Sequence, residues 1–139
     1  MAEAKKASFS FKEFMVPNFS YSSSDKEDLE LKLNFDPKGR YHKDQGIFEL
    51  VIEFTGTDGK HDEQIVKVTS VAFFEFSKDL DSKDIPVYFY SNSIAIVFPY
   101  IRAFISNLTL QANAGGVIML GLLNFSKMGT ILKENTIYE

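Results

Sequence analysis

The chain has no cysteine and no tryptophan, and only four of its 139 residues are proline. The absence of cysteine excludes disulfide frameworks, thiol catalysis and thiolate metal sites. Hydrophobic residues make up 45% of the chain and charged residues 24%, which is typical of a globular protein and argues against wholesale disorder. At this length we expect one domain, residues 1–139, with a hydrophobic core of its own.

Groups that carry catalysis or hold metals are also scarce. The two histidines, His42 and His61, lie in charged segments with turn residues. Asp62 and Glu63 follow His61, but a third nitrogen ligand and regular ligand spacing are missing, which favours a solvated loop over a metal site. A small α+β pocket enzyme usually begins with helices and places Asp, His or Tyr inside its pocket. This chain is expected to begin with strands, and its apolar half has no carboxylate or histidine. We therefore expect no enzyme activity, no catalytic residues, no cofactor and no metal.

Charge is missing from one long segment. The chain has 34 charged residues, yet residues 85–126 contain only Arg102. A segment with so little charge is usually covered by protein on most sides, and a domain this small has trouble covering a long helix all round. The segment therefore predicts burial between subunits, with a helix packed across a single sheet as the alternative.

The charge distribution also bears on partners and location. A net charge of −4 argues against nonspecific nucleic-acid or anionic-membrane binding. The N-terminus lacks the apolar stretch of a secretory signal, and Pro99, Gly115 and Gly116 interrupt the charge-poor segment, so we expect no membrane insertion. These features predict a cytoplasmic protein.

The first half of the chain alternates apolar and polar residues with a period of two, which predicts four strands over about 7–80. In the first strand, Phe9, Phe11, Met15, Phe19 and Tyr21 share one phase, and Glu13 and Pro17 interrupt it as in an edge strand. The Asp58-Gly59 pair predicts a hairpin turn. We expect an antiparallel meander.

The second half changes to a period of three and four. Apolar residues recur from Ile94 to Leu108 and predict a helix over about 92–113, capped by Ser91, Asn92 or Ser93 and kinked or broken at Pro99. An extended crossover and a short helix are expected over about 117–135, with Met128, Ile131 and Leu132 on one side of the helix. The predicted fold is α+β.

Three short motifs resemble the SecB family of protein-export chaperones: Phe98-Pro99-Tyr100, then Arg102, and the Asn124-Phe125 pair. The order of four strands, long helix, crossover and short helix is similar as well. The resemblance implies a homotetramer, a dimer of dimers with long helices between sheets, and ATP-independent holding of unfolded client polypeptides in apolar grooves for protein export. The implied oligomer interface consists of Ile94, Val97, Phe98, Tyr100, Ile101, Phe104, Ile105 and Leu108.

Two dense aromatic runs, 73–76 and 88–90, alternate in a way that a single sheet face cannot bury completely. Aromatic and Met side chains suit client binding because they offer large, adaptable contact area, but core packing is the alternative for each ring. The predicted client-binding residues are Phe73, Phe74, Phe76, Tyr88, Phe89, Tyr90, Met119, Leu120, Leu122 and Phe125.

The sequence departs from the export members of the family at the acidic residues through which they contact SecA. The aligned positions fall near Asn18, Tyr21-Ser22 and Lys67, none of which is acidic, although Glu13, Glu63 and Glu75 lie nearby. We therefore expect weak SecA docking. A chaperone of a toxin–antitoxin pair and a structural oligomerisation module remain the alternative functions.

Overall fold

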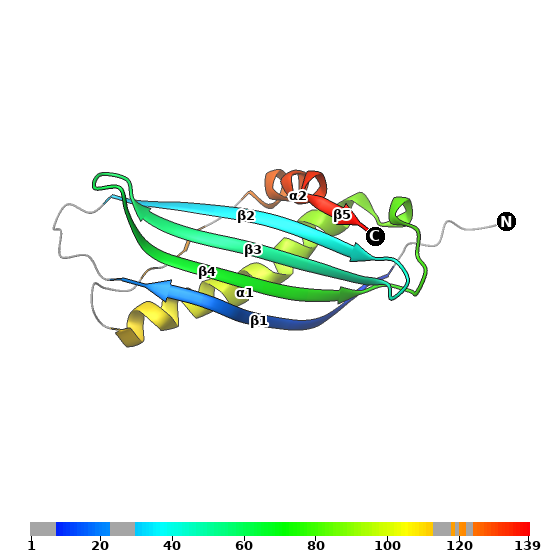
Figure 1. The fold of residues 1–139 in the computed structure, drawn as a ribbon, viewed down its shortest axis with the longest axis horizontal. Helices are drawn as coiled ribbons and strands as arrows, with labels where there is room; N and C mark the ends of the chain where they lie inside the picture. Colours follow the sequence, from blue (N-terminus) through cyan, green and yellow to red (C-terminus); the bar gives the residue numbers. More distant parts are fainter. Residues whose placement is uncertain (1–7, 23–29, 113–117, 119, 122–123) are drawn as a thin grey trace.

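The computed structural model describes residues 8–22, 30–112, 118, 120–121 and 124–139. As expected, the fold is α+β, with one sheet, a long helix and a short C-terminal helix (Figure 1). The strands are β1 (Ser10–Tyr21), β2 (Leu31–His42), β3 (Ile47–Asp58), β4 (Glu63–Glu75) and β5 (Thr136–Tyr138). The helices are the short 3-10 helix η1 (Ser82–Asp84), α1 (Val87–Ala112) and α2 (Phe125–Glu134).

The strand order differs from the expected four-strand meander. Only β2, β3 and β4 form a meander, because the sheet runs β1-β4-β3-β2-β5 and β1 pairs with β4 at the far edge. This is a Greek-key arrangement. A fifth strand, β5, adds to the other edge parallel to β2, which makes the sheet mixed. Alternation in a sequence identifies strands but not which strands pair. Strand β5 was not predicted because its three residues are too few to show alternation.

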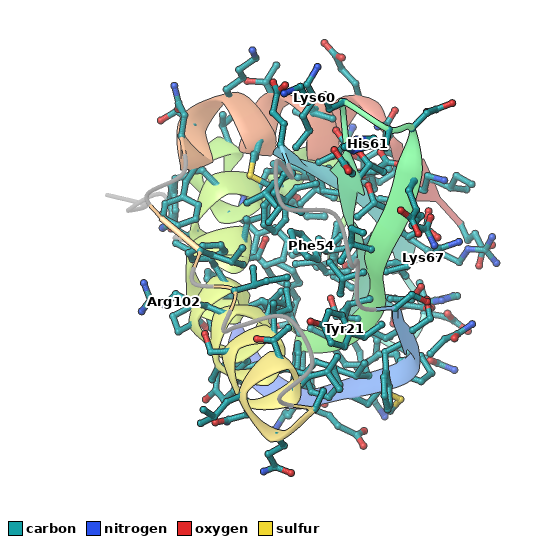
Figure 2. All side chains as sticks on the ribbon, turned by 90° about the vertical axis from the view of Figure 1, so that its left-hand side faces the viewer. Tyr21, Phe54, Lys60, His61, Lys67 and Arg102 are labelled. Atoms are coloured by element: carbon teal, nitrogen blue, oxygen red, sulfur yellow. The ribbon has the colours of Figure 1, made fainter. Side chains whose placement is uncertain are left out.

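Helix α1 crosses one face of the sheet diagonally, and none of the described helices lies on the other face, so the described residues form two layers (Figures 1 and 2). The inner positions of β3 and β4 are buried against α1, whereas Lys67 points outward from the opposite face (Figure 2). Confirming the alternation, the fully buried strand residues include Phe48, Leu50, Ile52, Phe54, Val66, Val68, Ala72 and Phe74.

Strand β1 keeps its apolar residues inward by means of two register shifts. The shifts against β4 fall between Phe11 and Glu13 and between Met15 and Asn18. Each adds one residue to β1, and an added residue reverses which side chains face inward. The expected single phase is therefore wrong for Met15, which lies on the outer face and is 37% exposed.

Helix α1 begins at Val87, five residues before the predicted start, and runs through Pro99 without a break. The early start follows from Phe89, whose ring is fully buried and draws the first turn onto the sheet. Pro86 precedes the helix, where its missing N–H costs nothing. The ring of Pro99 lies on the exposed side of α1.

The Asn124-Phe125 pair starts the second helix. Asn124 is the N-cap of α2, and its side chain accepts a hydrogen bond of 3.1 Å from the backbone N–H of Lys127. Met128 and Leu132 are buried and Ile131 is half-buried, as the sequence predicts. The Asn124-Phe125 pair therefore has a structural role: it fixes where the second helix begins.

Candidate functional site

Four of the predicted client-binding aromatics are core residues. Phe74, Phe76, Phe89 and Tyr90 are each at most 4% exposed. Phe89 is at the centre, with the ring centroids of Phe48, Phe76 and Phe9 at 4.9, 4.8 and 4.8 Å, respectively. These rings pack edge to face, an arrangement that aromatic pairs prefer. For these four residues the packing alternative holds in this conformation, because buried rings offer no area to a client.

The other predicted client-binding residues have different positions. Tyr88 is 45% exposed on α1, and Phe73 is half-buried on the outer face of the sheet. Phe125 is half-buried, with its ring 5.5 Å from that of Phe98, whereas Leu120 is only 6% exposed. Met119 and Leu122 lie outside the described residues.

The predicted interface residues lie mostly on the wrong side of α1 for contact with another subunit. Five of them, Ile94, Val97, Phe98, Ile101 and Ile105, are at most 5% exposed because they pack on the protein's own sheet. Phe104 and Leu108 are half-buried, and only Tyr100 is exposed, at 49%. The periodicity was sufficient to find the helix, but it marked the side that faces the sheet.

The side of α1 turned away from the core presents a continuous exposed surface without charge, which we call the α1 stripe; at its border, the Tyr100 ring also stacks on Phe14 of β1, with the centroids 5.4 Å apart. It comprises Asn92, Ile96, Pro99, Tyr100, Ala103, Asn107 and Leu110. Spacings of three and four place these residues on one line along the helix. Ile96, Tyr100 and Leu110 are 36%, 49% and 57% exposed. The same spacing is visible in the sequence, but α1 is apolar on almost every side, so the stripe does not stand out there.

Arg102, the single charge of the charge-poor segment, projects from α1 away from the sheet (Figure 2). Its guanidinium carbon lies 5.6 Å from the ring centroid of Phe98. This distance is within the range of a cation–π interaction. Arg102 therefore covers the edge of the core at Phe98 while its side chain stays in solvent.

A groove of about 660 Å³ opens between the first turns of α1 and helix α2; we call it the α1–α2 groove. Its lining residues are Val87, Tyr88, Tyr90, Ser91, Ser126, Gly129, Thr130 and Lys133. Gly129 lets the two helices approach closely, since a Cβ at this position would lie 2.8 Å from the backbone nitrogen of Ser91. The predicted residue Tyr88 contributes to this groove.

The inner end of the α1–α2 groove is tied to the C-terminal strand. The hydroxyls of Tyr90 and Tyr138 are 2.7 Å apart, and Lys133 Nζ lies 5.9 Å from the Tyr90 ring centroid. Burial, reinforced by the bond with Tyr138, raises the pKa of the Tyr90 hydroxyl, so it stays neutral. These contacts hold Tyr90 and β5 together at one side of the groove.

A second apolar surface lies along the exposed edge of β2, and we call it the β2-edge strip. It is formed by Leu33, which is exposed, and by the half-buried Phe35 and Phe125, whose rings flank the buried ring of Phe98. Leu33 is 42% exposed, and the ring of Phe35 lies 5.9 Å from that of Phe98. The strip thus connects the sheet edge, the middle of α1 and the start of α2.

The polar positions of α1 anchor the crossover rather than a ligand. Thr109 is fully buried, and its hydroxyl accepts a 2.9 Å hydrogen bond from the backbone N–H of Ile118. The hydroxyl of Ser106 donates to the carbonyl of Ile118 at 3.3 Å. The segment after α1 is therefore fixed to the helix at this point.

The outer face of the sheet carries paired charges. Lys67 Nζ lies 3.7 Å from Glu53 Oε1, and Arg40 and His42 both contact the carboxylate of Glu139, at 3.6 and 2.9 Å. Of the positions aligned with SecA-contacting acids, Asn18 is exposed on this face, but Tyr21 packs against the core. Lys67 is thus the aligned outward-facing position that carries a charge, and that charge is positive.

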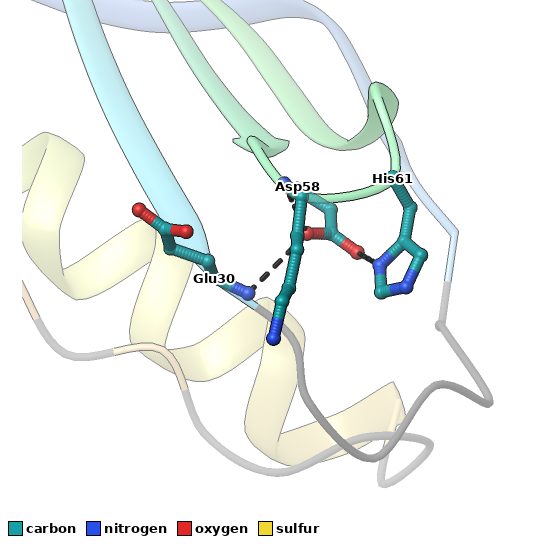
Figure 3. A network of polar contacts seen from close by, with 4 residues as sticks. Glu30, Asp58 and His61 are labelled. Carbon is teal, nitrogen blue, oxygen red and sulfur yellow. Dashed lines mark hydrogen bonds and ion pairs between the residues drawn. The ribbon is translucent and has the colours of Figure 1, made fainter.

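A buried carboxylate links the β3–β4 turn to the start of β2 (Figure 3). Asp58 is fully buried and accepts hydrogen bonds from the backbone N–H groups of Glu30 and Lys60, at 3.3 and 3.0 Å. His61 Nδ1 lies 2.5 Å from its other oxygen. Burial opposes ionisation of Asp58, but these hydrogen bonds outweigh it and lower the pKa of the carboxyl group. The predicted turn is confirmed, and the sequence did not reveal that Asp58 is its anchor.

Within the described residues, no three His, Cys, Asp or Glu side chains are grouped as metal ligands would be. His61 pairs with Asp58, three residues earlier, rather than with the neighbours that suggested a metal. Helix α1 is long and apolar enough to cross a membrane by length and composition alone, with a hydropathy of 1.4. A core helix of a soluble protein passes the same test, so this is weak evidence for a span.

Comparison with known proteins identifies the fold. No family model matches the chain. An uncharacterized protein of Methanocaldococcus jannaschii is 29% identical over 127 residues, which cover 86% of this chain and 81% of that protein. A SecB-like chaperone of Mycobacterium tuberculosis, solved in complex with an antitoxin peptide, superposes with a TM-score of 0.67 at 16% identity, over 84% of this chain and 88% of that one. The chain therefore has the fold of a SecB-like chaperone.

Proposed function

We propose that this protein is an ATP-independent holding chaperone, without enzyme activity, that binds unfolded polypeptides on exposed apolar surface in the cytoplasm. The observation that carries the proposal is the exposed, uncharged surface of helix α1 and its neighbours. Val87, Tyr88 and Leu33 are 72%, 45% and 42% exposed outside the α1 stripe. Large exposed apolar area on a folded domain indicates a surface that binds other chains. The SecB-like fold supports the same function.

The two kinds of apolar surface suit two partners. The α1 stripe is long, regular and free of charge, which suits a second copy of the same helix. The α1–α2 groove, whose lining residue Tyr88 lies one turn before the stripe, is concave, and the β2-edge strip lies at the edge of the sheet; both suit client segments. We therefore assign the stripe to assembly into at least a dimer, with a dimer of dimers as the family arrangement, and the other two surfaces to clients.

The test is suppression of aggregation. A chemically unfolded client diluted into an equimolar amount of this protein should scatter less light over time, without nucleotide. The effect should change little between low and high salt, because apolar contact is not screened. The matched control is the same client added in its folded state, which should not be bound. Unchanged aggregation would contradict the proposal and favour a structural oligomerisation module.

Binding to SecA distinguishes a role in protein export from a role with a toxin–antitoxin pair. Because Lys67 stands where a docking carboxylate aligns, we expect weak or undetectable calorimetric binding to the C-terminal zinc tail of SecA. Lys67→Glu should strengthen binding, mainly through the association rate, since charges at the rim of an interface steer encounter. Lys32→Glu makes the same charge change near the far edge of the sheet and should have little effect.

Tight, salt-sensitive binding of SecA by the unmodified protein would show that other carboxylates replace the missing ones, and the export function would then be favoured. The antitoxin peptide in the Mycobacterium tuberculosis complex makes a toxin–antitoxin role the second candidate for this chain.

A further inference from the structure

The α1–α2 groove combines apolar walls with one cation. Val87 is the most exposed large apolar residue of α1, at 72%, and Tyr88 extends the same wall. Both belong to the lining of the groove, which opens to solvent along their side. Exposed apolar area of this kind gains free energy when a ligand covers it. The walls therefore favour large apolar side chains.

The neutral hydroxyls of the groove are largely engaged within their own helices. Ser91 donates to the carbonyl of Tyr88 at 3.3 Å, and Thr130 donates to the carbonyl of Ser126 at 3.2 Å. A hydroxyl has one proton, so these two have none left for a ligand. The hydroxyls of Tyr88 and Ser126 remain as neutral donors, and Lys133, with three N–H donors, is the one charged donor in the lining of the groove.

Within the part of the chain that the structure describes, Lys133 has no carboxylate beside it. Among the ion pairs of the described residues, none involves this lysine, and its contact is the face of the Tyr90 ring. By contrast, Lys12, Lys38, Lys67 and Lys83 each lie within 4.0 Å of an acidic side chain. An ammonium group at an apolar groove, with no ion pair inside the described residues, favours an anionic ligand there.

We propose that the α1–α2 groove binds client segments in which large apolar side chains accompany a carboxylate, from Asp, Glu or a chain end, and that Lys133 pairs with this carboxylate. The inference rests on the proposed chaperone function and adds a preference to it. A polypeptide suits the site better than a small carboxylic acid, because Val87 and Tyr88 stay open on one side and small-molecule sites usually enclose their ligand.

The test uses two labelled peptides of equal length and identical apolar residues, one with a central Glu and the other with Gln. Fluorescence anisotropy with the full chain should show tighter binding of the Glu peptide. Lys133→Gln should weaken that peptide roughly three- to fivefold, the range of an exposed ion pair, and leave the Gln peptide unchanged. Lys127→Gln removes the other α2 lysine, which is outside the groove lining, and should change neither.

The paired substitution Val87→Ser and Tyr88→Ser should weaken both peptides, with the circular dichroism of the fold unchanged because both side chains are exposed. Equal affinity for the two peptides, binding of neither, or identical effects of Lys133→Gln and Lys127→Gln would overturn the inference. Competition by decanoate that depends on Lys133 and exceeds that of the Glu peptide would also overturn it, in favour of a small carboxylic acid.

Aggregation suppression separates this failure from failure of the proposed function. If the unmodified protein holds unfolded clients but shows no preference for the Glu peptide, only the inference about the groove is lost. If it neither holds clients nor binds either peptide, the chaperone function is lost together with the inference.

Discussion

Placing an aspartate at Ala103 should split the assembly without unfolding the chain. Ala103 is exposed at the middle of the α1 stripe, so the change costs the isolated chain only about 0.5 kcal/mol of helix propensity. In an interface between two stripes, the same carboxylate would be buried without a partner, at a cost of several kcal/mol. Association should therefore weaken by roughly a hundredfold or more. Light scattering and sedimentation at micromolar concentration measure the change.

Two controls make this result specific to the stripe. Ser126→Asp adds the same charge at an exposed position of α2 and should leave the measured mass of the assembly unchanged. Ile101→Asp should instead unfold the protein, because Ile101 is 1% exposed against the protein's own sheet. Ile101 and Ile105 belong to the interface expected from the sequence, but their burial makes them unsuitable for splitting an assembly. An unmodified protein that is monomeric at these concentrations would contradict the assignment of the stripe.

Removing the ring of Phe89 should produce the largest loss of stability. The ring is fully buried and is surrounded by the rings of Phe9, just before β1, Phe48 of β3 and Phe76, just after β4. Phe89→Ala loses the burial of the side chain and leaves a cavity that the surrounding rings cannot easily fill. The two effects together should cost about 3 to 5 kcal/mol. That is a large part of the free energy of unfolding of a typical domain. Urea unfolding followed by circular dichroism measures it.

The neighbouring Tyr88→Ala is the matched control. Its side chain is 45% exposed, so the loss should be about 1 kcal/mol or less. The pair also tests the structural assignment of the aromatic run: Phe89 is core and Tyr88 is surface. Equal effects on the free energy of unfolding would show that the first turn of α1 does not pack as described.

Local patterns were sufficient to predict most of the elements. Strands β2, β3 and β4 follow from alternation, and α2 follows from the spacing of Met128 and Leu132 after Asn124. The lack of charge over residues 85–126 indicated the segment that contains α1, the helix that packs across the sheet. These signals are readable because the period of a strand or a helix depends only on neighbouring residues.

The start of α1 is a position that the local sequence pattern predicts wrongly. Ser91, Asn92 and Ser93 are good capping residues, and from local chemistry the helix should begin there. It begins at Val87 instead, because burying Phe89 and Tyr90 in the core stabilises an earlier first turn. Tertiary packing outweighs the preference of a cap, which is worth about 1 kcal/mol.

The sequence by itself determined that this protein is an α+β domain whose apolar second half contains a long helix. The tertiary structure alone decided which side of that helix is free. The periodicity marks one side of α1, but the other sides are almost free of charge as well, so only the position of the sheet shows that Ile101 is buried and Ala103 is exposed. The same holds for the placement of β1 beside β4 and for the pairing of β5 with β2, since contacts between residues distant in the chain leave no periodic trace in it.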